Sequence, residues 1–340
     1  MSELAPAAPL PEIDAPVDGT RFAGLRAHGR PVVMRGLAAD WPAVAAAREG
    51  DGAESIVRYL TREPAPRPVR AIAAPPSEQG RFFYNPDLTG FNFQSGSGRL
   101  DLFLADLLRA RDMTDAPAMA VQSEELEELL PRFAADNLLP LLAGVRPRIW
   151  IGNRIRVAPH YDVKENVAVC VAGRRKFTLF PPDQIATLYP GPLELTPAGT
   201  PISMVDQQAP DLARYPRYAE AWRTAQQATL NPGDAVYIPY CWWHGVESLD
   251  PVSILVNYWW NEGQPEGAGS PYDALLHAML ALKHLPPAQR SVWRGMMDHY
   301  VFEVAGDPAA HLPPTARGLL GPPAPGLFAR MRAIIRGALG

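Results

Sequence analysis

The sequence predicts a mainly β fold, either a barrel or a two-sheet jelly roll, with α-helical additions before and after it in the chain. Short runs with strand character, separated by turn residues, lie between about residues 147 and 260, and the flanking regions show helical periodicity. The 340 residues include 38 prolines, which favour many short elements joined by loops. Closely spaced short strands are typical of barrels and jelly rolls.

The region before the barrel is predicted to alternate between helices and strands. Residues 1–18 are rich in proline and alanine without periodicity, so we expect them to form a loose arm. Helices are expected over residues 20–28, 54–60, 102–111, 124–133 and 136–142, and strands over residues 31–36 and 69–73. The aromatic segment 81–93 fits two interpretations. It is either an ordered loop over a pocket or a strand and turn that bury their rings in the core.

Within the barrel region the apolar residues follow the period of a strand. Strands are expected over residues 148–151, 168–171, 176–180, 235–238 and 254–260. Gly173 is predicted to form the hairpin turn between the second and third of these strands. One helix is expected to interrupt the series, over residues 211–228, with Tyr218 and Trp222 on the same side.

Helical periodicity returns after Pro271, and helices are expected over residues 272–282, 287–302 and 327–339. These helices carry large apolar side chains, such as Trp293 and Met296. They either cap the barrel or form a homodimer interface, because exposed apolar helices would be sticky in a monomer. We therefore expect an arm (1–18), a jelly-roll domain with helical insertions (19–268) and a C-terminal helical region (269–340).

Composition and charge exclude several classes of protein. The net charge of -4 gives no basic surface of the kind that binds nucleic acid. Cys170 and Cys241, the only cysteines, lie in apolar runs and are expected to be buried thiols rather than a disulfide scaffold. The N-terminus lacks the pattern of a signal peptide, and no run of about 18 apolar residues predicts a membrane span. The expected compartment is the cytoplasm.

Three side chains predict a metal site. His160 and Asp162 are separated by one residue, and side chains at this spacing on a strand point to the same face. His244 follows 82 residues after Asp162, which is consistent with a ligand from a distant strand. Two histidines and one carboxylate are the ligand set of a non-haem Fe(II) site with open positions, and zinc is the main rival metal.

The series of motifs around these residues resembles a known family, the JmjC-type, cupin-fold Fe(II)/2-oxoglutarate-dependent oxygenases. The likeness is strongest to bacterial cupin-like domain proteins and to the asparaginyl hydroxylase of hypoxia-inducible factor. It is carried by His160-Tyr-Asp162 with Asn166, Gly173-x-Arg175 with Leu-Phe-Pro-Pro182, Pro232-Gly-Asp234, Trp242-Trp243-His244-x-Val-Glu-Ser248 and Val256-Asn257-Tyr-Trp259, and by the earlier run Arg30 to Gly36. The resemblance implies a double-stranded β-helix with N-terminal α/β elements and a C-terminal helical bundle.

The resemblance also implies roles for individual residues. His160, Asp162 and His244 would hold Fe(II), and 2-oxoglutarate and O₂ would take the open positions. Arg175 stands where close relatives usually have a lysine that pairs with the distal carboxylate of 2-oxoglutarate, and arginine suits that role. The alternative partner is the next residue, Lys176, although alternation along a strand turns it to the other face. Asn166 and Asn257 match amides that line the co-substrate pocket.

Two positions depart from the pattern of the relatives. A hydroxyl three residues before the first metal ligand is replaced by Val157, and a tyrosine that helps to hold the co-substrate in the asparaginyl hydroxylase falls near Ala120. The co-substrate pocket is therefore expected to be less polar than in that relative.

Two functions follow as hypotheses. The first is an Fe(II)- and 2-oxoglutarate-dependent hydroxylase that acts on a C–H bond of a protein or peptide side chain or of a small molecule. The departures at Val157 and Ala120 motivate the second, a cupin-type protein that binds a metal or a carboxylate ligand without turnover. Demethylation of N-methyl-lysine ranks lower, because the sequence shows no reader domain and no basic surface for chromatin. No nucleic-acid or membrane partner is expected.

Overall fold

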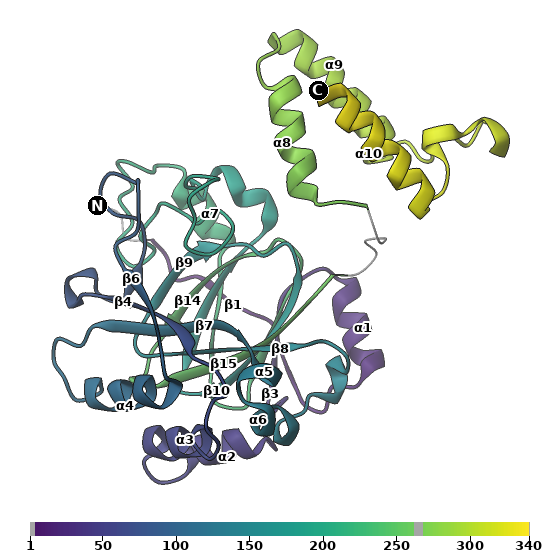
Figure 1. Ribbon diagram of the computed structural model, residues 1–340. Helices are drawn as coiled ribbons and strands as arrows, with labels where there is room; N and C mark the ends of the chain where they lie inside the picture. The colour runs from purple at the N-terminus through teal and green to yellow at the C-terminus, as the bar shows by residue number, and fades with distance from the viewer. Residues whose placement is uncertain (1–3, 262–267, 340) are drawn as a thin grey trace. The chain divides into compact units, whose positions relative to one another are not determined.

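The structure, a computed structural model, describes residues 4–261 and 268–339, and it divides the chain into two compact units, Met1–Asn261 and Glu262–Gly340. The first unit contains two β-sheets (Figure 1). The larger sheet has the order β2 (Glu12–Asp14), β3 (Val32–Arg35), β13 (Ala235–Ile238), β10 (Glu165–Ala172), β15 (Ser253–Trp260), β8 (Pro147–Gly152), β7 (Ala118–Glu125), β4 (Val69–Ala74) and β6 (Gln94–Gly98). The smaller sheet has the order β1 (Ala8–Pro9), β12 (Gln226–Leu230), β11 (Arg175–Phe180), β14 (Trp243–Ser248), β9 (Arg156–His160) and β5 (Arg81–Phe82).

The eight strands from β8 to β15 are divided equally between the two sheets. Strands β8, β10, β13 and β15 belong to the larger sheet, and β9, β11, β12 and β14 belong to the smaller one. Within each set of four, neighbouring strands are antiparallel. This arrangement is a jelly roll and confirms the predicted mainly β fold with helical additions.

The alternation of side chains along the strands separates two apolar cores. Val167 and Val169 of β10 pack into the cluster that also contains the buried faces of the helices, whereas Ala168 and Cys170 pack against Phe177 and other residues of the smaller sheet. Successive strand side chains point to opposite faces, so the second cluster fills the interior between the sheets. Residues whose side chains point to the same face of a strand as Ala168 on β10 or Phe177 on β11 therefore line the interior of the barrel.

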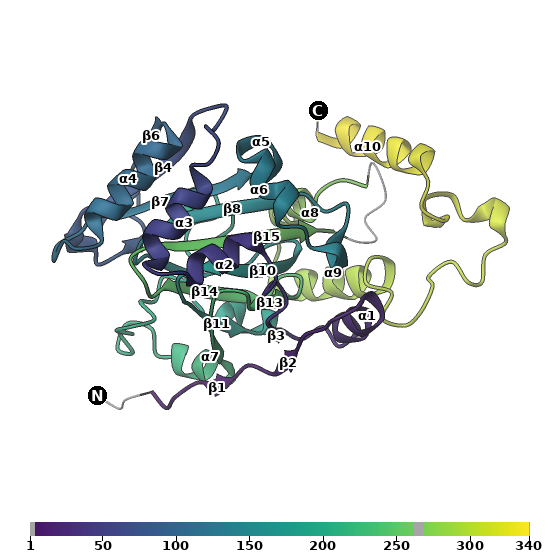
Figure 2. The ribbon, with the colours of Figure 1, turned by 90° about the horizontal axis from the view of Figure 1, so that it is seen from below.

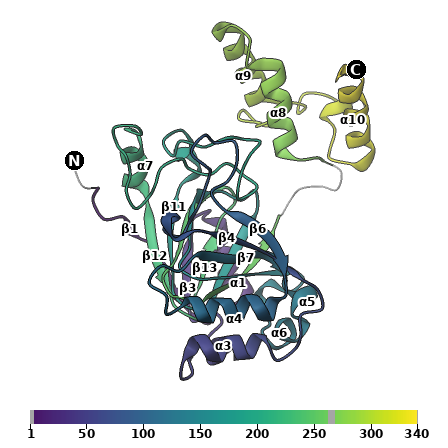
Figure 3. The same ribbon diagram turned by 60° about the vertical axis from the view of Figure 1, so that its left-hand side comes forward.

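Six helices cover the outer face of the larger sheet, where Figures 2 and 3 show most of them side by side. They are α1 (Gly19–Ala27), α2 (Pro42–Arg48), α3 (Gly52–Leu60), α4 (Leu100–Ala110), α5 (Leu126–Leu129) and α6 (Pro131–Asp136). In α3, Asp51 caps the first turn by accepting hydrogen bonds from the N–H groups of Ala53 and Glu54, and Ile56 and Leu60 are buried. A seventh helix, α7 (Tyr218–Thr224), packs on the outer face of the smaller sheet.

The hairpin predicted at Gly173 joins β10 to β11 and carries the chain from one sheet to the other. Gly173 has a φ of +67°, and a Cβ there would lie 2.5 Å from the carbonyl oxygen of Val252. Only glycine tolerates both the left-handed backbone and this close approach. The turn therefore fixes where β11 begins, and with it the inward position of Arg175.

The structure overturns two expectations about local structure. Residues 1–18 are not a loose arm throughout, because β1 pairs parallel with β12, β2 pairs parallel with β3, and Leu10 between them is buried. The extended backbone that proline favours is suited to the edge of a sheet. The helix expected over 211–228 is limited to α7, because residues from Gln226 onward pair with β11 as strand β12.

The aromatic segment 81–93 forms a short strand and a turn. Arg81 and Phe82 make up β5, Tyr84 forms a bridge with Phe91, and Phe82 and Tyr84 are buried. This result agrees with the second interpretation of the segment, in which its rings belong to the core.

The second unit contains α8 (Pro271–Leu282), α9 (Pro287–Tyr300) and α10 (Pro325–Leu339). No described residue of these three helices is buried, and Leu276, Trp293 and Met296 are among the large apolar side chains that are exposed. Among the described residues, no helix combines the length and the apolar character that crossing a membrane requires.

Candidate metal centre

The three predicted metal ligands come together at one end of the barrel. His160 is the last residue of β9, Asp162 follows in the adjoining loop, and His244 is the second residue of β14. His160 lies opposite His244 in the antiparallel register of the two strands. One ligand atom from each of the three residues lies within 4.8 Å of the others. The third ligand thus comes from the strand adjacent to the His-x-Asp strand, although the two are far apart in sequence.

Each histidine ring is oriented by a backbone carbonyl two residues earlier. His160 Nδ1 lies 3.1 Å from the oxygen of Ala158, and His244 Nδ1 lies 3.0 Å from the oxygen of Trp242. A carbonyl oxygen only accepts, so Nδ1 carries a proton in both rings, and in the neutral form of such a ring Nε2 keeps the lone pair. His244 Nε2 lies 3.6 Å from Asp162 Oδ2. Both imidazoles are therefore held in the tautomer that binds a metal.

The protonation states also suit a cation. Burial, together with the neighbouring His244, lowers the pKa of His160 to about 4, against the opposing effect of Asp162. The ring is thus neutral at pH 7, as a metal ligand must be. Asp162 Oδ2 is buried and has no hydrogen-bond partner among the described residues. A buried carboxylate oxygen without a partner is costly, and a bound cation would offset that cost. The residues fit a divalent metal ion.

Two amides lie deeper in the barrel. Asn166 and Asn257 are both buried, and Asn257 Nδ2 lies 3.4 Å from Asn166 Oδ1. Trp150 of β8 donates from Nε1 to Asn257 Oδ1 at 2.8 Å and so fixes the orientation of this amide. The two predicted amide residues are therefore neighbours, and Trp150 is an additional member of the site. Its inward position on β8 could have identified it from strand alternation.

Arg175 lies further along the same interior. Leu179 of β11 is opposite His244, and Arg175, four residues away on the same face, is opposite Ser248. Arg175 is 4% exposed. It donates from Nε to Ser253 Oγ at 2.9 Å and from Nη2 to the backbone carbonyl oxygen of Ser253 at 3.5 Å. Burial lowers the pKa of Arg175 to about 10, so the guanidinium remains charged at neutral pH. No carboxylate of the described residues forms an ion pair with it.

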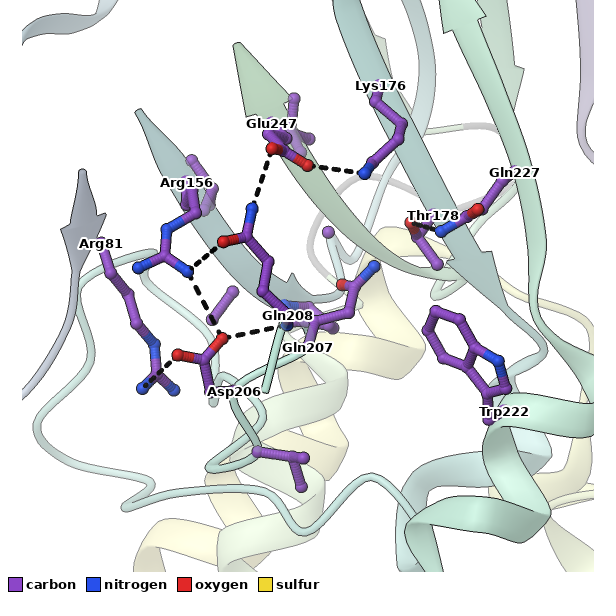
Figure 4. Close-up of a pocket in the computed structure, with 16 residues that line it drawn as sticks. Arg81, Arg156, Lys176, Thr178, Asp206, Gln207, Gln208, Trp222, Gln227 and Glu247 are labelled. Carbon is purple, nitrogen blue, oxygen red and sulfur yellow. Dashed lines mark hydrogen bonds and ion pairs between the residues drawn. The ribbon is translucent and has the colours of Figure 1, made fainter. Parts of the chain in front are cut away.

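The structure places Lys176 away from the ligand cluster. Its Nζ pairs with Glu247 Oε2 at 2.8 Å on the outer face of the smaller sheet. There it lines a cavity of about 440 Å³, shown in Figure 4, in which Gln208 links Glu247 to Arg156. The alternation expected along β11 is therefore observed, and Arg175 rather than Lys176 shares the barrel interior with the metal ligands.

A comparison with known protein families places this geometry in a wider context. Residues 20–265 match the family described as "Cupin-like domain". The chain belongs to the cupin-like domain family. This assignment confirms the resemblance to cupin-like and JmjC-type proteins that the motifs indicated.

Curated proteins are similar to about a third of this cupin-like chain. It is similar to "Lysine-specific demethylase JMJ31" of Arabidopsis thaliana, with 38% identity over 112 residues, 33% of this chain and 20% of the relative. It is 38% identical to "HSPB1-associated protein 1" of Homo sapiens over 120 residues, 34% of this chain and 24% of the relative. It is 31% identical to "Lysine-specific demethylase 8" of Xenopus tropicalis over 113 residues, 33% of this chain and 24% of the relative. The chain thus spans about a fifth to a quarter of the length of these relatives.

The two departures from the pattern of the relatives lie together in the cupin-like barrel. Ala120 and Val157 belong to one apolar cluster, whose buried members include Ile72, Phe82 and Ile155. Val157 is partly exposed and lies opposite Val246 of β14. One wall of the interior near the metal ligands is therefore apolar, as the sequence predicted.

Proposed function

We propose that this cupin-like protein is an Fe(II)- and 2-oxoglutarate-dependent oxygenase that hydroxylates a C–H bond of a protein or peptide side chain. The observation that carries the proposal is that two groups of residues share the interior of one barrel. At one end lie two oriented histidines and a carboxylate oxygen without a hydrogen-bond partner, and further along lies a buried guanidinium that forms no ion pair, as far as the described residues go. The first group suits a divalent metal, and the second suits an organic anion.

The proposed roles follow from these positions. His160, Asp162 and His244 would hold Fe(II) and leave adjacent coordination positions open. Fe(II), when bound, supplies the activation of O₂ that is coupled to the oxidation of 2-oxoglutarate. Arg175 would pair with the far carboxylate of this co-substrate. Asn166 and Asn257 would line the space between the metal and that anchor.

The class of substrate is proposed from the relatives and not from a described surface. Two of the relatives are named lysine-specific demethylases, and a lysine is a protein side chain. Removal of an N-methyl group and hydroxylation of another side-chain carbon both begin with attack on a C–H bond. Release of formaldehyde would separate demethylation from the stable hydroxylation proposed here.

Turnover of the co-substrate provides the first test. Purified protein supplied with Fe(II), ascorbate and O₂ should convert 2-oxoglutarate into succinate, measured by mass spectrometry. His160→Ala should reduce this rate to the background level, because it removes a proposed metal ligand. His28→Ala, which changes an exposed histidine outside the site, is the matched control and should keep the wild-type rate. Undiminished succinate formation by His160→Ala would contradict the proposal.

The apolar wall around Val157 and Ala120 favours one alternative, a cupin-type binding protein without turnover. Such a protein would bind a divalent metal through His160, Asp162 and His244 but would not bind 2-oxoglutarate. Titration calorimetry with Mn(II), followed by 2-oxoglutarate, distinguishes the two. A heat of binding only in the first titration would favour the alternative.

A further inference from the structure

One buried hydroxyl inside the barrel has no hydrogen-bond partner in the part of the chain that the structure describes. Ser248 lies on β14, four residues after His244 and therefore on the same inward face. The residue is 3% exposed, and its Oγ makes no hydrogen bond with any described residue. An unsatisfied buried hydroxyl is destabilising, so its presence calls for a functional explanation.

The neighbour of Ser248 also has unused hydrogen-bonding capacity. Ser248 lies directly opposite Arg175 in the antiparallel register of β11 and β14, and side chains at such positions have Cβ atoms about 5 Å apart. Arg175 donates to Ser253 from Nε and Nη2. Its Nη1 has no hydrogen-bond partner among the described residues. The Arg175 guanidinium and the Ser248 hydroxyl therefore belong to opposite residues on the same inward face, and each keeps a donor without a partner among the described residues.

The groups around Arg175 and Ser248 favour an anion as the ligand of this pair. On one side, Val157 and Ala120 belong to an apolar cluster and offer no side-chain hydrogen-bond donor. Arg175 and Ser248 lie on β11 and β14, which are adjacent strands of the smaller sheet. A carboxylate has two oxygens and a negative charge, so it can accept from Arg175 and Ser248 at once and also balance the charge of the guanidinium.

We infer that Ser248 is a second anchor for the far carboxylate of 2-oxoglutarate, donating from Oγ to one oxygen while Arg175 pairs with the other. This inference rests on the proposed function. It assigns a co-substrate-binding role to a residue other than the metal ligands, the arginine and the two amides. It also explains how an interior with an apolar wall at Val157 retains a hydroxyl donor for the anion.

Binding measurements on the Mn(II)-loaded protein test the inference without turnover. Calorimetry would compare 2-oxoglutarate with 2-oxopentanoate, which has the same chain length and keto-acid end but no far carboxylate. Ser248→Ala should weaken 2-oxoglutarate binding about tenfold, as expected for one lost hydrogen bond to a charged acceptor. The same substitution should leave the affinity for 2-oxopentanoate within twofold of that of wild type, because the hydroxyl would have no carboxylate to meet.

Thr178→Val is the matched control, because it removes a buried hydroxyl from the outer face of the same sheet. It should leave both affinities unchanged, and thermal melting would check that each variant is folded. If Ser248→Ala lowers the affinity for both ligands equally, the effect is structural and the inference is overturned. Wild-type affinity for 2-oxoglutarate in Ser248→Ala would also overturn it but would leave the proposed function intact. Failure of the wild-type protein to bind 2-oxoglutarate would overturn the proposed function itself, and this inference with it.

Discussion

His160 and His244 face each other across the antiparallel pair of β9 and β14, with their ring centroids 4.3 Å apart. Hydrogen bonds from both rings to the backbone leave the two Nε2 atoms free beside Asp162. The backbone therefore helps to orient both histidines. These hydrogen bonds restrict the rotation of the two rings, which reduces the entropic cost of binding a metal.

Asp162→Asn is expected to separate metal binding from folding. In the metal-free protein the substitution removes a partly buried carboxylate whose buried Oδ2 has no hydrogen-bond partner among the described residues, so the melting temperature should stay the same or rise. Affinity for Mn(II) should fall at least about 100-fold. Loss of a metal ligand should weaken binding more than loss of a residue that only hydrogen-bonds to a ligand. Melting curves with and without Mn(II) measure both effects. A metal-induced rise in melting temperature equal to that of wild type would contradict the prediction.

Arg175→Met and Lys176→Met should differ sharply, although they change adjacent residues. Arg175 lies in the barrel, whereas Lys176 pairs with Glu247 on the outer face. Loss of the Arg175 cation should weaken 2-oxoglutarate binding by about two orders of magnitude, the scale of a buried charge pair. Lys176→Met should change it less than twofold. Calorimetry on the Mn(II) forms provides the comparison, and a reversed order of effects would assign the anchor to Lys176.

The pairing of Asp250 with Arg174 is expected to make stability depend on pH. Asp250 accepts hydrogen bonds from the backbone N–H, Nε and Nη2 of Arg174 at 2.7, 3.0 and 3.0 Å, and these bonds hold the pKa of Asp250 below its usual range. A lowered pKa stabilises the folded state above the unfolded-state pKa, about 3.9, and this contribution is lost as the pH falls through the folded-state pKa.

Asp250→Asn should therefore lower the free energy of unfolding at pH 7 by about 1 kcal/mol, a modest figure because Arg174 is half-exposed and solvent screens the pair. The difference between wild type and variant should shrink toward pH 3. Urea denaturation at both pH values measures it. Because Arg174 adjoins Arg175, the variant should also bind 2-oxoglutarate more weakly. A difference in stability that is independent of pH would refute the role of the charge.

We propose that the C-terminal helices mediate a homodimer. Helices α8, α9 and α10 contain no buried residue among those described, and Leu276, Trp293 and Met296 expose large apolar surfaces. Exposed apolar surface is often covered by a partner. Sedimentation velocity on the full chain should give twice the monomer mass. The double variant Trp293→Ser, Met296→Ser should shift the protein toward the monomer, while Arg294→Ser on the same helix should not.

Much of the fold was predictable because strand and helix periods are local properties of the sequence. The short strands between residues 147 and 260, the hairpin at Gly173 and the opposite directions of Arg175 and Lys176 all follow from alternation and from the backbone needs of glycine. The arm at Ala8 to Asp14 was not predictable in the same way. Its strands exist only because the edges of two sheets, built from distant segments, accept them.

The candidate metal ligands could be predicted from sequence alone, since His160, Asp162 and His244 carry their chemistry in residue type and spacing. Tertiary structure decided which other groups share the interior with them. The partnership of Trp150 with Asn257, and the position of Ser248 opposite Arg175, depend on the register between strands that are far apart in the chain. Register is set by the packing of whole sheets against each other, and no single segment contains that information.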